Sequence, residues 1–472
     1  MTAQTRVRDV MVVRSSSTAL EPYAPRLVVD WLRDSPHDTF REIHGSLAFV
    51  DISGFTTLTE RLARNGKVGA EEMSDLLNAT FAQLLEVAYL DGAGLVQWGG
   101  DAVLLLFQGE DHAARACRAA YRMRARMRRI GKLDTSAGRV VLQMSVGIHS
   151  GTFHFFLVGD PAIHRELLIS GPAASRCAEL EALADAGEIA ISHQTAALLT
   201  PRIVGEPKGD GLLLGGEPCL DDLVVVPRPP SDGLDIGSAL PVAIREHLEQ
   251  AAGEAEHRQI AVAFVQFSGT DALLAEQGAE VLAAALDEAI RNVQEATSHH
   301  GVTFFETDIN RDGCKIMLTA GAPRSSDHDE EWMLRAARRI MDRVGVLPLR
   351  VGVNRGPVFA GDFGPPFRKT FSVKGDAVNL AARVMGKAAP GQVLATLAVV
   401  ERSRTVFDIE PLPPFMVKGK SQPVSAASIG RALGERDDPD TSAPLVGRES
   451  EMATLAAALD AARSLRGSRT LL

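Results

Sequence analysis

Two aspartates stand in sequence motifs that suit metal and phosphate chemistry. Asp51 opens the run DISGFT, directly after an apolar strand-like segment, and Asp101 lies further along in GGDAVLLLF, in the turn of a predicted hairpin. The neighbouring glycines let a ligand approach the backbone closely. Taken singly, an Asp beside a Gly is typical of a turn. Two carboxylates at neighbouring strand ends, however, offer the hard oxygen ligands that Mg²⁺ prefers.

The backbone that follows Asp51 is suited to an anion. It leads from a strand into a helix, where amide groups face phosphate oxygens favourably. We therefore expect substrate contacts from Ile52, Ser53, Gly54, Phe55 and Thr56. The expected metal-binding set is Asp51, Ile52 and Asp101.

The chain contains an internal repeat. Three motifs occur twice in the same order, as LAFVDISGFTTL (47–58) and VAFVQFSGTDAL (262–273), SVGIHSG (145–151) and RVGVNRG (350–356), and LLISGPAASRCAEL (167–180) and TFSVKGDAVNLAARV (370–384). A repeat at this scale indicates duplicated structural units. The sequence thus predicts two homologous modules, over residues 44–228 and 256–430.

The elements within each module predict how these residues are positioned. An apolar strand precedes a helix over 70–90, and two strands follow over 94–100 and 102–107. The order βαββαβ predicts an α+β, ferredoxin-like module. The remaining segments are a lead-in (1–43), a linker rich in Pro, Gly and Asp (229–255) and a C-terminal segment (431–472).

The motifs FVDISGFT, GGDAVLLLF, SVGIHSG and VKGDAVNLAARV together resemble class III adenylyl and guanylyl cyclases over about residues 25–430. The resemblance implies modules that pack head to tail as a pseudo-heterodimer, with sites built from both halves and two Mg²⁺ or Mn²⁺ ions. The tandem layout and the opening LEPYAPRLVVDWL are most similar to soluble, bicarbonate-responsive adenylyl cyclases and their bacterial relatives.

The resemblance also assigns roles in the second module. Asn379 would position the ribose, and Arg383, on the same helical face, would stabilise the transition state. Lys418 matches a lysine that neutralises the triphosphate. The other interpretation of these residues is surface charge with an Asn at a helix start. The implied reaction is adenylate cyclase chemistry, which forms cyclic AMP and pyrophosphate from ATP.

Base selection is expected at Gln97 and Ser372. In the family, Lys with Asp or Thr selects adenine and Glu with Cys selects guanine, so this chain departs from both patterns. An amide at Gln97 can donate to adenine N1 or accept from its N6 amine, and it can also serve guanine. We expect ATP as substrate. The alternatives are relaxed ATP/GTP specificity and a nucleotide-binding regulatory module without turnover.

Each module lacks what the other supplies, which predicts one complete site and one degenerate site. Ser175 and Glu179 stand at the positions of Asn379 and Arg383, while Gln266 and Cys314 stand at those of Asp51 and Asp101. Related soluble cyclases use the degenerate pocket for bicarbonate, held by basic side chains. Arg176 is the cation available here, and we expect at most weak bicarbonate stimulation.

Composition excludes several function classes. The net charge of −10 argues against nucleic acid as a partner, because phosphate-backbone binding needs a basic surface. No apolar run is long enough for a membrane span. Four dispersed cysteines without a CxxC pair predict reduced thiols, so we expect a cytoplasmic protein.

The C-terminal segment SAPLVGRESEMATLAAALDAARSLRGSRTLL resembles the approach to a P-loop ATPase of the signalling type. No GxxxxGK[ST] motif follows within the sequence. We expect the full-length protein to continue into an ATPase and output region.

Overall fold

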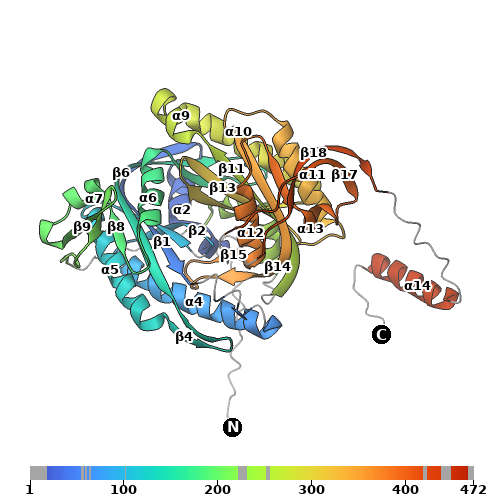
Figure 1. The fold of residues 1–472 in the computed structure, drawn as a ribbon, viewed down its shortest axis with the longest axis horizontal. Coiled ribbons are helices and arrows are strands. Elements are labelled where there is room, and N and C mark those ends of the chain that lie inside the picture. Colours follow the sequence, from blue (N-terminus) through green and yellow to red (C-terminus); the bar gives the residue numbers. More distant parts are fainter. Residues whose placement is uncertain are drawn as a thin grey trace, which may run out of the picture.

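The fold is that of a computed structural model, which describes residues 19–54, 58, 61–62, 65–100, 102–221, 231–250, 256–417, 422–436 and 448–465. The strands in this part of the chain form two eight-stranded sheets and one two-stranded ribbon. Figure 1 shows the first module in blue to green, packed beside the second in yellow to orange. The C-terminal helix is drawn apart from both.

The first half of the chain contains ten strands, with helices before and between them. Its elements are η1 (Glu21–Tyr23), α2 (Arg26–Asp34), β1 (Phe40–Ser53), α4 (Gly66–Leu90), β2 (Gly94–Gly99), β3 (Ala102–Gln108), α5 (His112–Ile130), β4 (Lys132–Thr135), β5 (Gly138–Val141), β6 (Gln143–Val158), β7 (Glu166–Ser170), α6 (Pro172–Leu183), β8 (Ile189–Ile191), α7 (His193–Ala197), η2 (Pro201–Ile203), β9 (Val204–Lys208) and β10 (Gly211–Leu214).

The second half repeats this arrangement and adds a C-terminal helix. Its elements are η3 (Ile236–Ala239), α8 (Val242–Glu249), β11 (Glu256–Ser268), α9 (Thr270–Gln277), α10 (Ala279–His300), β12 (Thr303–Asn310), β13 (Gly313–Ala320), α11 (Asp329–Asp342), β14 (Leu349–Phe363), β15 (Thr370–Lys374), α12 (Asp376–Met385), β16 (Val393–Thr396), α13 (Leu397–Val400), β17 (Thr405–Pro411), β18 (Ala426–Glu435) and α14 (Glu449–Leu465).

The two large sheets have equivalent strand orders. The first is β2-β3-β1-β6-β8-β10-β9 and the second is β12-β13-β11-β14-β16-β18-β17, with β7 and β15 paired to β6 and β14. This equivalence confirms the predicted α+β class with two βαββαβ modules. Each sheet also contains strands that the sequence analysis did not predict. A parallel strand pairs with the long central strand, β8 with β6 and β16 with β14. Two antiparallel strands follow it at the edge of each sheet.

The sequence of strand β3 is almost entirely apolar because both faces of the strand are covered. Val103, Leu105 and Phe107 pack into the core beneath α4 and α5. Leu104 and Leu106, which alternate with them, pack on the other face against α2. Side chains on a strand point to opposite faces in turn, so a strand covered on both sides is apolar at every position.

The predicted linker over 229–255 contains structure that packs against the N-terminal lead-in. Residues 231–250 include η3 and α8, and Ile236 is fully buried beside Leu20 and Val29. Helices α2 and α8 therefore hold equivalent places, each one just before the first long strand of its module.

The modules face each other with a head-to-tail relation. Strand β12 lies against β2 and β7, while α4 contacts β11 and β14 and its counterpart α10 contacts β1 and β6. Each pair has its equivalent across the interface, which is the signature of a pseudo-twofold axis.

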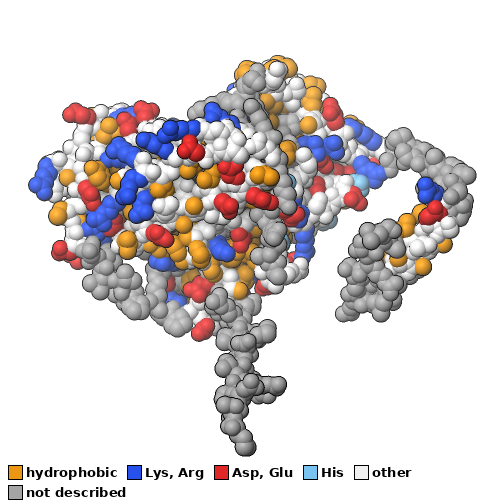
Figure 2. Space-filling view, turned by 90° about the horizontal axis from the view of Figure 1, so that it is seen from below, with side chains coloured by type: hydrophobic (Ala, Val, Ile, Leu, Met, Phe, Trp, Pro, Cys, Tyr) orange, Lys and Arg blue, Asp and Glu red, His pale blue; other side chains and the backbone are white. Residues whose placement is uncertain are grey.

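Within the described residues, no helix combines the length and apolar character needed to cross a membrane. Figure 2 shows acidic and basic side chains mixed over the face of the molecule seen from below, with hydrophobic side chains along α14. On α14, Met452, Leu455 and Leu459 are all exposed.

Candidate active site between the modules

A cavity of about 200 Å³ lies between the two modules, and both contribute to its wall. The first module supplies two apolar side chains of α4 and the glycines at the end of β2, while the second supplies strand and helix residues with charged and amide groups. We call it the intermodule cavity. Its walls include Met73, Leu77, Gly99, Gly100, Glu306, Asp308, Lys315, Lys374 and Asn379.

Helix α12 brings Asn379 to this cavity because the helix lies very close to β14. A Cβ atom added at Gly352 would lie 2.0 Å from the backbone nitrogen of Met385, so only glycine allows this approach. Asn379 lines the cavity, and Arg383 follows one turn later. The buried Nη1 of Arg383 has no hydrogen-bond partner among the described residues. A donor in that condition favours an anionic acceptor.

The end of β1 carries Asp51 and Ile52, which are predicted to bind metal. Asp51 is partly exposed and pairs with Ala102 of β3, so it lies beside the start of that strand. Ile52 is buried in the core beneath α4, which leaves its backbone as its only polar part. Gly54 has a φ of +97°, and a side chain there would meet the carbonyl oxygen of Val141 at 2.9 Å. Such a conformation is readily available only to glycine.

Several predicted site residues lie outside the described part of the chain. They are Phe55, Thr56, Asp101 and Lys418. Their assignments stay predictions.

Gln97, which is predicted to read the base, does not line the intermodule cavity, whereas its equivalent Glu306 does. Gln97 pairs with Leu104 after a bulge in β2, and Glu306 pairs with Met317 after the same bulge in β12, so the two positions are equivalent. Only Glu306 lines the intermodule cavity together with Asn379. The amide of Gln97 instead donates to the Leu167 carbonyl at 3.3 Å and to the Thr307 hydroxyl at 3.2 Å.

Glu306 is an unusual carboxyl group because of where it lies. Burial between the modules raises the pKa of Glu306 to about 7, and the nearby carboxylates Asp308 and Glu166 act in the same direction. Lys374 acts to lower this pKa. Ser372, the second predicted base-reading residue, is fully buried, and its hydroxyl has no hydrogen-bond partner among the described residues.

Two lysines close the remaining walls. Lys374 reaches across the interface and donates to the carbonyl oxygen of Gly100 at 2.5 Å. Lys315 forms an ion pair with Asp308 at 2.8 Å, and Asp308 lies against Gly99, where an added Cβ would be 2.7 Å from its Oδ1. Both lysines line the intermodule cavity together with Glu306 and Asp308.

At the degenerate position, side chains of the second module replace the metal-binding groups. Gln266 pairs with Lys315 just as Asp51 pairs with Ala102, which places Gln266 at the position of Asp51. Arg350 donates from Nε and Nη2 to Gln266 Oε1, at 2.9 and 2.6 Å, so a fixed cation stands beside it. The thiol of Cys314 is buried and contacts the carbonyl of Ile169 at 3.4 Å.

Asp312 lies at the start of α9, close to the residues of the predicted degenerate site. The carboxylate of Asp312 accepts hydrogen bonds from the backbone amides of Gly269 and Asp271, both at 3.0 Å, at the start of α9. Its own amide donates to the Ser175 hydroxyl at 2.8 Å. Glu179 forms an ion pair with Arg311 at 3.0 Å. A protein carboxylate therefore takes the amides that would otherwise face a phosphate.

Arg176 is turned to its own module. It pairs with Asp210 Oδ2 at 2.5 Å and donates to the Asp210 carbonyl at 2.8 Å, and Glu179 lies 3.4 Å away. With two acidic partners, this guanidinium is poorly placed to hold bicarbonate.

Sequence reasoning missed the four charged groups Glu306, Asp308, Lys315 and Lys374. Strands β2 and β12 share almost no residue types, so no sequence motif matches Gln97 to Glu306. Their equivalence is visible only in the structure, where each residue follows the same bulge in its strand.

Comparison with known proteins places this geometry in context. The family described as Adenylate and Guanylate cyclase catalytic domain matches residues 40–217 and again residues 253–427. An uncharacterized protein of Mycobacterium tuberculosis (strain ATCC 25618 / H37Rv) is 31% identical over 177 residues, covering 36% of this chain and 31% of that protein. Adenylate cyclase type 10 of Homo sapiens is 22% identical over 435 residues, covering 82% of this chain and 26% of that protein.

The chain thus spans between a quarter and a third of the length of these curated relatives. Among solved structures, a class III adenylyl cyclase-like ATP-binding protein from Pseudomonas aeruginosa superposes with a TM-score of 0.56 at 13% identity. The match covers 77% of this chain and 85% of that one, and it concerns the fold alone.

Proposed function

Because this chain belongs to the family of adenylate and guanylate cyclase catalytic domains, we propose that it converts a purine nucleoside triphosphate into a 3′,5′-cyclic nucleotide and pyrophosphate in the intermodule cavity. The observation that carries the proposal is the composite wall. One module contributes α4 and the glycines at the end of β2 to this wall, and the other contributes Asn379 on α12.

In the proposed reaction the 3′-oxygen of the ribose bonds to the α-phosphorus, the bond from that phosphorus to the bridging oxygen breaks, and pyrophosphate leaves. The 3′-hydroxyl proton passes to solvent. Asn379 orients the ribose, and the unpaired N–H of Arg383 donates to the α-phosphate as negative charge develops there. Lys418 is assigned to the triphosphate.

Catalytic domains of this family generally use divalent metal ions. The donor chemistry fits, since Asp51 offers a partly exposed carboxylate and Ile52 a backbone carbonyl at the same strand end. We assign these oxygens and Asp101 to two Mg²⁺ or Mn²⁺ ions. Ions bound there would lower the pKa of the 3′-hydroxyl and offset charge on the leaving pyrophosphate.

The base is assigned to Glu306 and Ser372. An ionised Glu306 can accept from guanine N1–H and the 2-amino group, while Ser372 donates to O6. A protonated Glu306 can donate to adenine N1 and accept from the 6-amino group. Because the pKa of Glu306 is about 7, both forms are populated near neutral pH. We therefore propose that the chain uses both ATP and GTP, in place of the ATP preference expected from Gln97.

The test is direct. Purified chain is incubated with equimolar ATP and GTP and either Mg²⁺ or Mn²⁺, and cyclic AMP and cyclic GMP are quantified. Protein with Arg383→Ala, prepared in the same way, controls for a contaminating cyclase. Absence of both products from the unaltered chain contradicts the proposal, and nucleotide binding without product would instead support a regulatory module.

The degenerate position is assigned no turnover, because Arg350 and Asp312 occupy the places of a metal and a phosphate. Residues 431–472 are assigned to a connection into an ATPase-like region, as their sequence suggests.

A further inference from the structure

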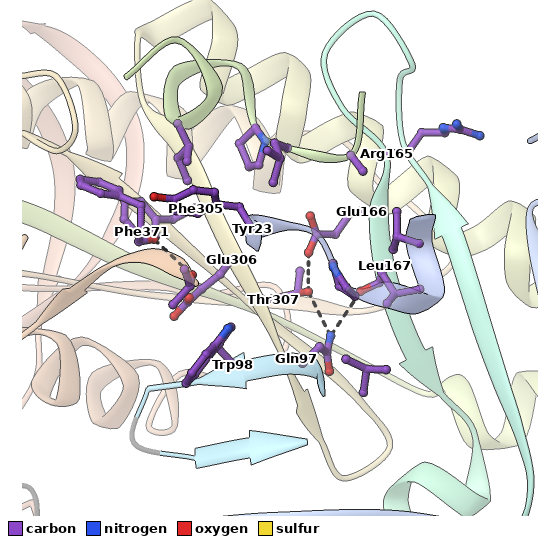
Figure 3. Close-up of a pocket in the computed structure, with 18 of the residues that line it drawn as sticks. Tyr23, Gln97, Trp98, Arg165, Glu166, Leu167, Phe305, Glu306, Thr307 and Phe371 are labelled. Carbon is purple, nitrogen blue, oxygen red and sulfur yellow. Dashed lines mark hydrogen bonds between the residues drawn. The ribbon is translucent and has the colours of Figure 1, made fainter. Parts of the chain in front are cut away.

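A second cavity, of about 100 Å³, lies on the pseudo-twofold axis. Equivalent residues of the two modules line it in pairs, Gln97 with Glu306 and Leu167 with Phe371. The segments around η1 and α2 on one side and around η3 and α8 on the other complete its wall. We call it the axial cavity. Figure 3 shows Gln97 and Trp98 on one side of it and Phe305 and Phe371 on another.

Four buried polar atoms of residues that line the axial cavity lack partners. They are the Nε1–H of Trp98, the Nε–H groups of Arg165 and Arg368 and the Oε1 of Gln97, none of which has a hydrogen-bond partner within the described residues. Trp98, Arg368 and Gln97 are only 5%, 4% and 6% exposed. Buried polar atoms are nearly always satisfied, so these atoms indicate an occupant that supplies both an acceptor and a donor.

Side chains of both charge signs line the axial cavity, namely Arg165 and Arg368 on one hand and Glu166 and Glu306 on the other. Arg368 is held by the carbonyl oxygens of Pro22 and Tyr23, and burial lowers its pKa to about 10, which leaves it charged at neutral pH. Opposite charge comes from Glu166, which accepts from the Thr307 hydroxyl at 2.6 Å. An anion would lie near the carboxylate and a cation near the guanidinium, so a neutral occupant is favoured.

The rest of the wall is apolar. Val96, Ile244, Phe305 and Phe371 line it, and Ile244 belongs to α8, outside both sheets. These side chains suit a hydrocarbon or ring surface rather than water alone, because bound waters need two to four polar partners each.

We propose that the axial cavity binds a small uncharged molecule that carries an amide-like edge, one carbonyl oxygen and one N–H, on an apolar body. The carbonyl oxygen accepts from Trp98 or Arg368, and the N–H donates to Gln97. The axial cavity meets the intermodule cavity at Glu306, which lines both, and the other side chains named here line the axial cavity alone.

Occupancy would act on the arrangement of the modules. Both modules line the axial cavity, and so do helices α2 and α8. A ligand that fits only when the two modules are packed against each other therefore stabilises that arrangement. Such a ligand would change the rate of any reaction in the intermodule cavity through the packing of the modules and through Glu306, which lines both cavities. Binding itself can be measured without turnover, so it tests this site independently of the proposed cyclase function.

The probe is 2-pyridone, which has one ring, one carbonyl oxygen and one adjacent N–H. Its binding to the purified chain is measured by isothermal titration and by saturation-transfer NMR. For a ligand of this size we expect a dissociation constant of about 1 mM. Trp98→Phe keeps an aromatic ring but removes the donor, and should weaken binding about tenfold. Trp332→Phe, at a tryptophan outside this cavity, is the matched control and should bind normally.

A second variant guards against misfolding of the first. Ile244→Trp fills the axial cavity from α8 and should abolish binding. Equal binding by the unaltered chain, Trp98→Phe and Ile244→Trp would place the ligand elsewhere and overturn the proposal. So would a lack of saturable binding to the unaltered chain, or equally tight binding of N-methyl-2-pyridone, which lacks the N–H.

Discussion

The titration of Glu306 should control the choice between the two purine nucleotides. Ionised Glu306 presents two acceptors, which match the N1–H and amino group of guanine, and protonated Glu306 presents one donor and one acceptor, which match adenine. Raising the pH therefore favours GTP and lowering it favours ATP. Glu306→Gln replaces the titrating carboxyl by an amide, so the preference of this variant should no longer depend on pH.

The structure gives the size of this effect. With a pKa of about 7, Glu306 is about one tenth ionised at pH 6 and about nine tenths ionised at pH 8. If GTP requires the ionised form and ATP the protonated form, the ratio of their kcat/KM values changes about tenfold per pH unit, or about a hundredfold over this range. The charged neighbours Lys374, Asp308 and Glu166 set the midpoint, so a shifted midpoint with the same slope is compatible with the argument.

The assay is a competition. Both nucleotides are supplied together at constant free Mg²⁺, and initial rates of cyclic AMP and cyclic GMP formation are measured from pH 6 to 8. Taking the ratio cancels groups that titrate in the same way for both substrates, such as the triphosphate. A ratio that does not vary with pH in the unaltered chain, or the same slope in Glu306→Gln, would refute the role of Glu306.

Further changes test the other assignments. Asp51→Asn keeps the side-chain volume but removes the carboxylate, and should abolish cyclic nucleotide formation with an unchanged circular dichroism spectrum. Arg383→Ala should lower kcat about a hundredfold with little change in KM, because its contact strengthens in the transition state; a raised KM at constant kcat would make it a ground-state contact. Gly352→Ala drives a methyl group into the backbone of α12, so it should lower the free energy of unfolding by about 3 kcal/mol or more and abolish activity. Gly434→Ala is the control, because no atom lies within 4 Å of its added Cβ. Thermal unfolding should show a far smaller loss of stability for this control. Bicarbonate, compared with chloride at fixed pH, should stimulate weakly or not at all, and strong stimulation that survives Arg176→Ala would contradict the filled degenerate position.

The sequence by itself determined the duplicated fold, and it predicts a division of labour between the two modules. Repeated motifs predicted two modules, because a strand followed by a helix at the same spacing folds in the same local way wherever it occurs. The difference between the two modules was also visible in the sequence, because Gln266 stands at the position of Asp51 and Ser175 at that of Asn379. Residues whose role depends on a local motif, such as Asn379 and Arg383 on one helix, were assigned without any tertiary information.

Only the tertiary structure decided which side chains of the two modules share a wall. Gln97 and Glu306 hold equivalent strand positions, and the pairing of β12 with β2 across the interface sets where each one points. The occupation of the degenerate position by Arg350 and Asp312 also depends on strand ends that are distant in sequence. Local propensity acts over a few residues, whereas burial, charge coupling and the pKa of Glu306 arise from groups that meet only after both modules have folded and docked.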